Sequence, residues 1–248
     1  MIPIKTEKEI KLMGEGGERL FRVMDSLLKR VELGVKLSEL DRLAEALIKK
    51  EGGKPSFKIV PDYHWATCIN INQGVVHGIP TDYQVKKGDL VSLDIGMFYQ
   101  GLHTDMARTI KAGGGESKFL KAGTTALKKA IQKGKAGNYV GHISQAIERE
   151  IKKFGFNPVW ALIGHGVGRK LHEAPQIPCF LGGKVEETPE LKPGMTLAIE
   201  VIYAEGNPAV VLVKDGWTVK TRDGSLAGLF EDTILVTETQ PLILTVAS

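Results

Sequence analysis

Four acidic residues stand inside segments that are otherwise typical of buried strands. They are Asp94 in "LVSLDIGMF", Asp105 in "LHTDMARTI", Glu200 in "MTLAIEVIY" and Glu231 in "LFEDTILV". An exposed strand edge would explain any one of them. Four are harder to explain in that way, because burying an unpaired carboxylate costs several kcal/mol. Divalent cations would remove that cost, so the four positions predict a metal centre.

The two aspartates lie in one expected hairpin, residues 90–110, with Gly101 near its turn. If the tip falls between Tyr99 and Gln100, Asp94 and Asp105 are directly opposite, about 4.5 to 5.5 Å apart at their β-carbons. Like charges so placed destabilise a sheet unless a cation lies between them. A tip displaced by one residue would instead turn one aspartate towards water.

The stretch "GHGVGRKLHEAP", residues 164–175, places two histidines among glycines. A phosphate-binding G-x-G-x-x-G loop would need glycine where Arg169 or Leu171 stands. The glycines are better explained by a backbone that passes close to a crowded site. Carboxylates with an imidazole suit Mn, Fe(II), Co or Mg better than a structural zinc. Four carboxylates also balance two divalent ions, and two ions about 3.5 to 4 Å apart are a known hydrolytic arrangement.

Apolar periodicity and turn residues predict the elements that position these side chains. Helices are expected at 7–31, 38–50 with Ser38 as N-cap, 116–133 and 141–154. Extended segments are expected at 65–77, 89–110, 159–163, 195–204, 209–213 and 229–237. The order of two helices followed by strands therefore occurs twice, which indicates two similar halves.

Two local matches support this repeat. The segment "VKKGDLVSLDI" (85–95) aligns without gaps on "LKPGMTLAIEV" (191–201), which places Asp94 on Glu200. Upstream, "HGIP" at His77 resembles "HEAP" at His172. A lysine and glycine before a strand form a common turn, so one match alone would carry little weight. Two matches in the same order favour a diverged duplication.

Composition limits the class of protein. The 248 residues are 42% hydrophobic and 25% charged, which is ordinary for a globular chain of one large or two small domains. A net charge of +4 argues against a dedicated nucleic-acid binder. Cys68 and Cys179 form no CxxC pair, which fits a reducing compartment. The N-terminus resembles no signal peptide, and no run approaches the roughly 20 apolar residues of a membrane span. We expect a cytoplasmic protein.

Taken in order, several motifs resemble the methionine aminopeptidase family in its short bacterial type 1 form. They are "HGIP", "LDIG", "HTDMART", "GHGVGRKLHEAP", "GMTLAIE" and "DGWTVKTRDGSLAGLFEDTILVT". The resemblance covers nearly the whole chain. It implies an α+β pita-bread fold, with two pseudo-symmetric αβ halves around a central antiparallel sheet and the site between them. Residues 1–248 would form a single catalytic domain, with halves at approximately 1–111 and 112–248.

Carried over by position, the resemblance implies roles for eleven residues. The dinuclear metal ligands would be Asp94, Asp105, His165, Glu200 and Glu231. Among these, Asp105 and Glu231 would bridge both ions, Asp94 would complete one site, and His165 with Glu200 the other. Glu200 would also shuttle a proton, and His77 and His172 would contact the substrate as catalytic histidines without binding metal. The methionine pocket would draw on Tyr63, Cys68, Trp217 and the Leu171 position.

The implied reaction removes N-terminal methionine from nascent proteins and peptides when the second residue is small. Two divalent ions, Mn, Fe(II) or Co, would activate the hydroxide that attacks the first peptide bond. The implied partners are nascent polypeptide N-termini, including those emerging at the ribosome. The resemblance implies a monomer, with no membrane and no specific nucleic acid.

Three departures from the family pattern bear on pocket shape, metal affinity and rate. Val201 stands where proline is usual, and Leu229 with Phe230 where polar residues are common. Leu171 replaces a frequent phenylalanine.

Two alternatives keep the fold. Prolidases and aminopeptidase P share the ligands and cleave before proline, but they generally carry an added N-terminal domain. A non-catalytic pita-bread module would bind RNA or protein, and such relatives usually lose metal ligands.

Overall fold

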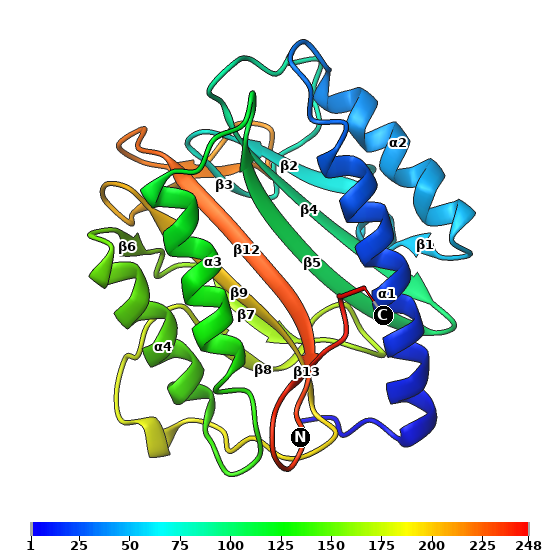
Figure 1. Ribbon diagram of the computed structural model, residues 1–248, viewed down its shortest axis with the longest axis vertical. Coiled ribbons are helices and arrows are strands. Elements are labelled where there is room, and N and C mark those ends of the chain that lie inside the picture. The colour runs from blue at the N-terminus through cyan, green and yellow to red at the C-terminus, as the bar shows by residue number, and fades with distance from the viewer. Residues whose placement is uncertain (1, 248) are drawn as a thin grey trace.

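A curved, mainly antiparallel sheet forms the centre of the computed structural model, which describes residues 2–247 (Figure 1). The ten-stranded sheet has the order β1-β4-β5-β12-β9-β7-β8, with β2 on β4, β6 on β9 and β13 on β12. Its strands are β1 (Lys54–Pro55), β2 (Thr67–Ile71), β4 (Leu90–Tyr99), β5 (Leu102–Lys111), β6 (Asn157–Pro158), β7 (Ile163–Gly166), β8 (Glu173–Pro178), β9 (Thr196–Ala204), β12 (Ala227–Leu235) and β13 (Leu242–Ile243). A smaller sheet of three strands has the order β10 (Val210–Leu212), β11 (Val219–Thr221) and β3 (Gly74–Val76).

Four helices cover one face of the large sheet, one pair on each side of its middle (Figure 1). They are α1 (Glu7–Leu28), α2 (Leu37–Lys50), α3 (Lys118–Ile131) and α4 (Val140–Lys153). The helix α1 packs on β4 and β5, and α3 packs on β12 and β9. Two short 3-10 helices, η1 (Phe57–Ile59) and η2 (Val185–Glu187), lie in the connections. Each helix pair shares a hydrophobic core with its half of the sheet.

Local capping chemistry fixes the start of α1. At α1, the Thr6 hydroxyl accepts from the Glu9 backbone N–H, and the Glu9 carboxylate accepts from the Thr6 N–H. The predicted N-cap at Ser38 was wrong, because α2 begins at Leu37 and the Ser38 hydroxyl donates to Asp82 instead.

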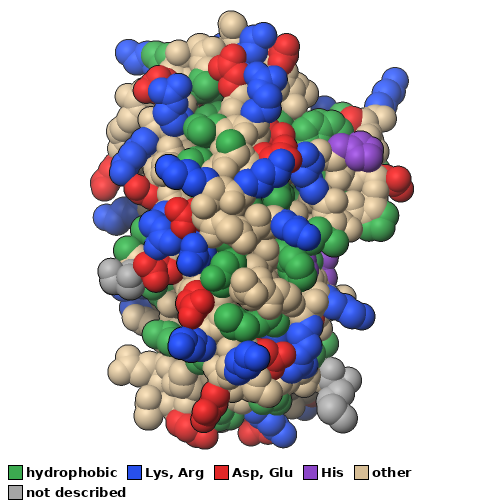
Figure 2. Space-filling model, turned by 90° about the vertical axis from the view of Figure 1, so that its right-hand side faces the viewer, with side chains coloured by type: hydrophobic (Ala, Val, Ile, Leu, Met, Phe, Trp, Pro, Cys, Tyr) green, Lys and Arg blue, Asp and Glu red, His purple; other side chains and the backbone are tan. Residues whose placement is uncertain are grey.

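Figure 2 shows the α1 and α2 side of the molecule, where basic and acidic side chains are interspersed over this exposed face. Among residues 2–247, no helix is long and apolar enough to cross a membrane.

The β4–β5 hairpin differs from its predicted register by two residues. Gln100 and Gly101 form the turn with positive φ angles of 50° and 90°, a two-residue connection that matches strand twist. Asp105 therefore faces Gly96, and Asp94 faces Ala107. The predicted direct opposition of the aspartates was wrong. A shift of two keeps side-chain parity, so both still point to one face.

The expected strand at 159–163 was also displaced. There β6 ends at Pro158 and β7 begins only at Ile163, the last residue of the expected strand, while Val159 still donates to the Ile202 carbonyl at 2.9 Å. The remaining expected elements are present with ends shifted by a few residues.

Equivalent turns lead into β4 and β9. Gly88 and Gly194 have φ angles of 93° and 85°, a region that favours glycine. Their N–H groups donate to the Ala112 and Val236 carbonyls, each at 3.0 Å. The two aligned sequence segments thus enter their strands through the same turn, on opposite sides of the β5–β12 seam.

Candidate metal centre

A cavity of about 140 Å³ lies on the face of the sheet opposite the helices, and it collects every side chain that the sequence assigned to a site. Those residues are His77, Asp94, Asp105, His165, His172, Glu200, Glu231, Tyr63, Cys68, Leu171 and Trp217, joined by Phe57, Val60 and Val76. A wider groove of about 650 Å³ shares His77, His165, His172 and Glu200 with it and continues past Ala161 and Gln176.

Strand register explains why the acids meet. Asp94 pairs with Ala107, Ala107 with Glu231, and Glu231 with Glu200, so these positions form one row across β4, β5, β12 and β9. Asp105 lies two residues along β5 from Ala107 and therefore on the same face.

The histidine of β7 joins this row from the side. His165 pairs with Ala198, which lies two residues from Glu200 on β9. Its Nε2 lies 3.6 Å from Glu200 Oε1, and its Nδ1 lies 2.8 Å from the Gly166 carbonyl. Burial and the nearby His172 lower the pKa of His165 to about 4, so the imidazole is neutral and able to bind a metal near neutral pH.

The acidic cluster is unsatisfied without a cation. One buried oxygen each of Asp94, Asp105 and Glu231 has no hydrogen-bond partner. Burial raises the pKa of Asp94 to about 8. Burial, and then the neighbouring carboxylates, raise the pKa values of Asp105, Glu200 and Glu231 well above their ordinary range. Orphaned buried carboxylates of this kind indicate a missing positive charge.

The donor geometry fits a divalent cation. Asp105, His165 and Glu231 each offer one ligand atom, and these atoms all lie within 4.8 Å of one another. Asp94 and Glu200 extend the oxygen-rich set on either side of Glu231 along the row. Oxygen donors with one imidazole match a catalytic divalent metal rather than a sulfur-bound structural zinc.

Two further histidines stand at the mouth of the cavity. The rings of His165 and His172 lie 4.4 Å apart at 77°, yet His165 is buried and His172 is exposed. His77, also exposed, has a φ of 57°, in the left-handed region. Desolvation of the ring by the surrounding cavity wall, and then the nearby His172, lower the pKa of His77. The structure therefore separates a buried histidine among the acids from two at the entrance.

The other wall of the cavity is apolar. The Tyr63 and Trp217 rings meet edge-on at 5.0 Å, and Phe57, Cys68 and Leu171 complete the cluster. The Tyr63 hydroxyl lies 2.8 Å from the Thr67 carbonyl and 3.2 Å from Cys68 Sγ. Burial raises the pKa of the Cys68 thiol well above its usual value, which leaves it a small lining group rather than a nucleophile.

The departures from the family pattern divide by face. Val201 and Phe230 pair across β9 and β12 and belong to the core beneath the helices, where a β-carbon at Gly123 would lie 2.3 Å from the Phe230 ring. Leu229 is completely buried and lies two residues from Glu231, on the face of β12 that carries the site, and Leu171 lines the cavity. Of the four, Leu171 is the one positioned to alter pocket shape directly.

Sequence reasoning missed two residues that hold the acids in place. Thr233 Oγ1 accepts the Asp105 N–H and donates to the Asp105 carbonyl. Arg108 donates to the Glu231 carbonyl at 2.6 Å and to Asp232 at 2.7 Å. Both lie beside the acids in motifs already noted, but only the pairing of β5 with β12 shows their partners.

A buried centre of four carboxylates and one imidazole, beside an apolar pocket, is that of a metal-dependent enzyme. A model of metallopeptidase family M24 matches residues 11–238. The chain belongs to this family, which makes a divalent metal its expected cofactor.

Relatives in sequence and structure agree with that assignment. The chain is 39% identical over 248 residues to the methionine aminopeptidase of Clostridium perfringens and 40% identical to methionine aminopeptidase 1 of Bacillus subtilis, with 99% of each chain covered. The structure of methionine aminopeptidase from Thermotoga maritima superposes with a TM-score of 0.95 at 40% identity, again over 99% of both chains. Prolidase from Pyrococcus furiosus gives 0.78 at 26% identity, and the match covers 66% of its length. The predicted α+β pita-bread fold is confirmed.

Proposed function

We propose that this chain is a methionine aminopeptidase that removes N-terminal methionine when the second residue is small. One observation carries the proposal: a cluster of acids with orphaned oxygens and a buried histidine shares its cavity with an apolar, aromatic-walled pocket. Relatives of nearly equal length at 39% and 40% identity carry the name methionine aminopeptidase.

The metal site is proposed to hold two divalent ions, Mn, Fe(II) or Co. Asp94, Asp105, His165, Glu200 and Glu231 would hold these ions, and Asp105 and Glu231 would contribute to both. When bound, such ions act as Lewis acids that activate water and polarise a peptide carbonyl. Four carboxylates and two divalent cations leave this buried site close to neutral, which removes the cost of burying the acids.

The side chains around the site have distinct tasks. Glu200 accepts a proton from the attacking water and returns it to the leaving nitrogen. His172, at the mouth, donates a hydrogen bond to the oxygen that becomes negative, and His77 contacts the scissile amide. The free α-amine of the substrate lies towards Asp94, at the opposite end of the carboxylate row from Glu200.

The small cavity and the wider groove together determine which substrate fits. The apolar wall of the small cavity, formed by Tyr63, Cys68 and Trp217, encloses the methionine side chain. The wider groove past Gln176 takes the rest of the peptide. The proposed partners are nascent polypeptide N-termini, including those at the ribosome, and the proposed state is a monomer in the cytoplasm.

A tripeptide assay tests the proposal. The protein loaded with Mn, Co or Fe(II) is expected to release methionine from Met-Ala-Ser, and a chelated control is expected to release none. Release from Ala-Pro but not from Met-Ala-Ser would favour the prolidase-like alternative. No release from either peptide with any of the three metals would contradict the proposal.

A further inference from the structure

The two cavity histidines of the glycine-rich segment are held in different ways. His165 belongs to β7 and pairs with Ala198 on one side and Gln176 on the other. His172 lies in residues 167–172, a loop between β7 and β8 that we call the histidine turn. The sheet therefore fixes His165. His172 lies just outside the sheet, next to Glu173, which pairs with Gly166, so its position also depends on the contacts that hold the histidine turn.

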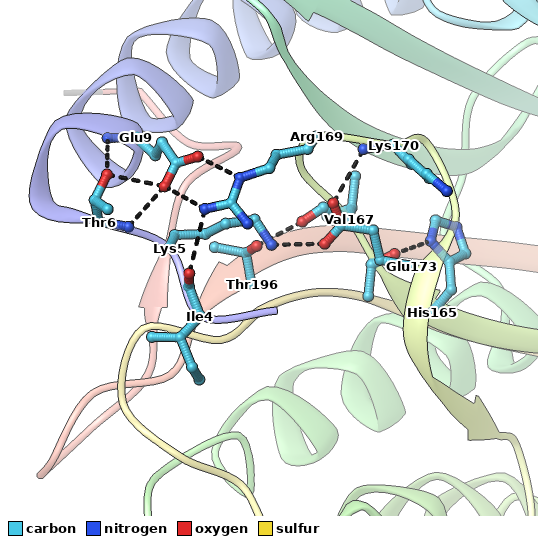
Figure 3. A network of polar contacts seen from close by, with 11 residues as sticks. Ile4, Lys5, Thr6, Glu9, His165, Val167, Arg169, Lys170, Glu173 and Thr196 are labelled. Carbon is cyan, nitrogen blue, oxygen red and sulfur yellow. Dashed lines mark hydrogen bonds and ion pairs between the residues drawn. The ribbon is translucent and has the colours of Figure 1, made fainter. Parts of the chain in front are cut away.

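A lysine from the start of the chain reaches the end of this turn (Figure 3). Lys5 Nζ lies 2.6 Å from Glu173 Oε2, and the side chains are only 1% and 5% exposed. The other Glu173 oxygen accepts the Lys170 N–H at 3.0 Å. The carboxylate directly after His172 thus joins the histidine turn to a residue 168 positions away.

The turn is shaped around the lysine stem. Gly168 has a φ of 154°, and a β-carbon there would lie 2.1 Å from Lys5 Cε. The Gly168 carbonyl accepts the His103 N–H at 2.7 Å, which fixes the turn from the hairpin side. The Lys5 backbone N–H donates to the Gly194 carbonyl at 2.8 Å, so the lysine is anchored at both ends.

A second ion pair on the same turn differs in its environment. Arg169 Nε lies 2.5 Å from Glu9 Oε1, but the Arg169 side chain is 49% exposed. This pair is bidentate, because Arg169 Nη2 also lies 2.8 Å from Glu9 Oε2, but water reaches the guanidinium, so losing the pair leaves no charge buried. Breaking a buried pair by removing one partner instead leaves an uncompensated charge. Arg169 therefore offers a matched control for Lys5.

We propose that the buried Lys5–Glu173 ion pair positions His172 at the mouth of the cavity, so that the N-terminal segment sets the substrate-contacting histidine. Lys5 lines neither the small cavity nor the wider groove, so it is a positioning residue. Glu173 lines the wider groove, so the kinetic test is made at Lys5. The kinetic consequences of this inference rest on the proposed function, but the structural coupling does not.

Kinetics and metal affinity form the first test. On Met-Ala-Ser, K5M is expected to lower kcat about 10- to 100-fold, because a small displacement of a catalytic group costs that much. The control R169Q is expected to change kcat less than about 2-fold. Mn affinity, measured by calorimetry, is expected to change less than about 3-fold in K5M, because the sheet holds His165 and the hydrogen bonds that orient the ligands are intact.

A double-mutant cycle separates positioning from general damage. If Lys5 acts through His172, K5M in an H172A background is expected to lower kcat less than about 2-fold further. An undiminished effect of K5M in that background would overturn the proposal, as would a kcat loss that follows a loss of Mn affinity. Should K5M fold poorly, the double variant K5M/E173Q removes both buried charges and is expected to fold and to keep the kcat loss. A K5M/E173Q variant with wild-type kcat would likewise overturn it.

Hydrogen exchange on the metal-free protein gives a readout independent of activity. Amides of residues 167–172 are expected to exchange about 10-fold faster in K5M or K5M/E173Q than in the wild type, and at the wild-type rate in R169Q. Unchanged exchange in both lysine variants would contradict the proposal. If the wild type releases no methionine, the proposed function fails, and this exchange comparison still decides whether Lys5 holds the turn.

Discussion

The Thr233 side chain takes the place of a backbone partner for Asp105. Its hydroxyl accepts the Asp105 N–H at 2.9 Å and donates to the Asp105 carbonyl at 2.8 Å. Thr109 does the same for Leu229 on the opposite strand, at 2.9 Å and 2.8 Å. Two threonine bridges, one from each strand, therefore close the β5–β12 seam around Glu231, and one of them holds a proposed metal ligand.

Replacing Thr233 with valine is expected to weaken metal binding. Valine keeps the shape but leaves the Asp105 backbone without its partners, and loss of an outer contact to a ligand typically costs about 10- to 100-fold in metal affinity. Calorimetric titration with Mn measures the effect. T109V is the matched control and is expected to change the affinity less than about 3-fold, because Leu229 is not a ligand. Equal effects of the two variants would contradict a specific role for Thr233.

The metal-free protein is expected to lose stability as pH rises from about 6.5 to about 8. Burial raises the pKa of Asp94 to about 8 and that of Asp105, Glu200 and Glu231 well above the ordinary range. The folded state therefore keeps protons that the unfolded chain releases near pH 4, and raising the pH lowers the free energy of unfolding. Below about pH 6.5 His165 opposes this trend. Its pKa is lowered in the folded state, so as the pH falls the unfolded chain binds a proton at this histidine at a higher pH than the folded protein does.

Thermal unfolding of chelator-treated protein at the two ends of that window measures this dependence. Adding Mn at the higher pH is expected to raise the Tm, since a ligand that binds the folded state stabilises it. A Tm that rises with pH in the absence of metal would show that the acidic cluster does not hold these protons.

The aromatic wall of the pocket is expected to control substrate affinity. Trp217 packs edge-on against Tyr63 at 5.0 Å beside the cavity. W217A is expected to raise the KM for Met-Ala-Ser about 10-fold or more, with a smaller change in kcat, because apolar pocket contacts contribute to binding at this scale. Trp160, which is 61% exposed and does not line the cavity, supplies the control variant W160A. A KM that rises equally in both variants would place methionine elsewhere.

Substitution of His172 is expected to separate catalysis from metal binding. H172A is expected to lower kcat about 100-fold, the scale of a lost hydrogen bond to a developing oxyanion. Metal content by elemental analysis is expected to stay at the wild-type level, because His172 is exposed outside the acidic cluster. The exposed His64, which does not line the cavity, is the control, and H64A is expected to behave as the wild type. Loss of metal in H172A would show that His172 binds metal and that its proposed role is wrong.

Local patterns predicted much of the fold. The helices and the long strands follow from apolar periodicity and turn residues, which act within a few positions of each other. The hairpin register was missed by two, because it depends on which residues take positive φ, here Gln100 and Gly101. The acids of β4 and β5 still share a face, because an even shift preserves alternation.

Local sequence patterns could not predict the residues that position the site. Thr233 meets Asp105 over 128 positions and Lys5 meets Glu173 over 168, and no spacing rule connects residues so far apart. These contacts arise from strand pairing and from the docking of the N-terminal segment. The type of a residue can suggest a metal ligand, whereas a positioning residue is recognised by its partner.

Anomalous diffraction from crystals loaded with Mn or Co tests the central claim most directly. Two anomalous peaks are expected among Asp94, Asp105, His165, Glu200 and Glu231. His165 and Glu200 should bind one ion, and Asp94 the other, with His172 in contact with neither. Absence of a peak in this cluster, or a peak bound by His172, would contradict the account.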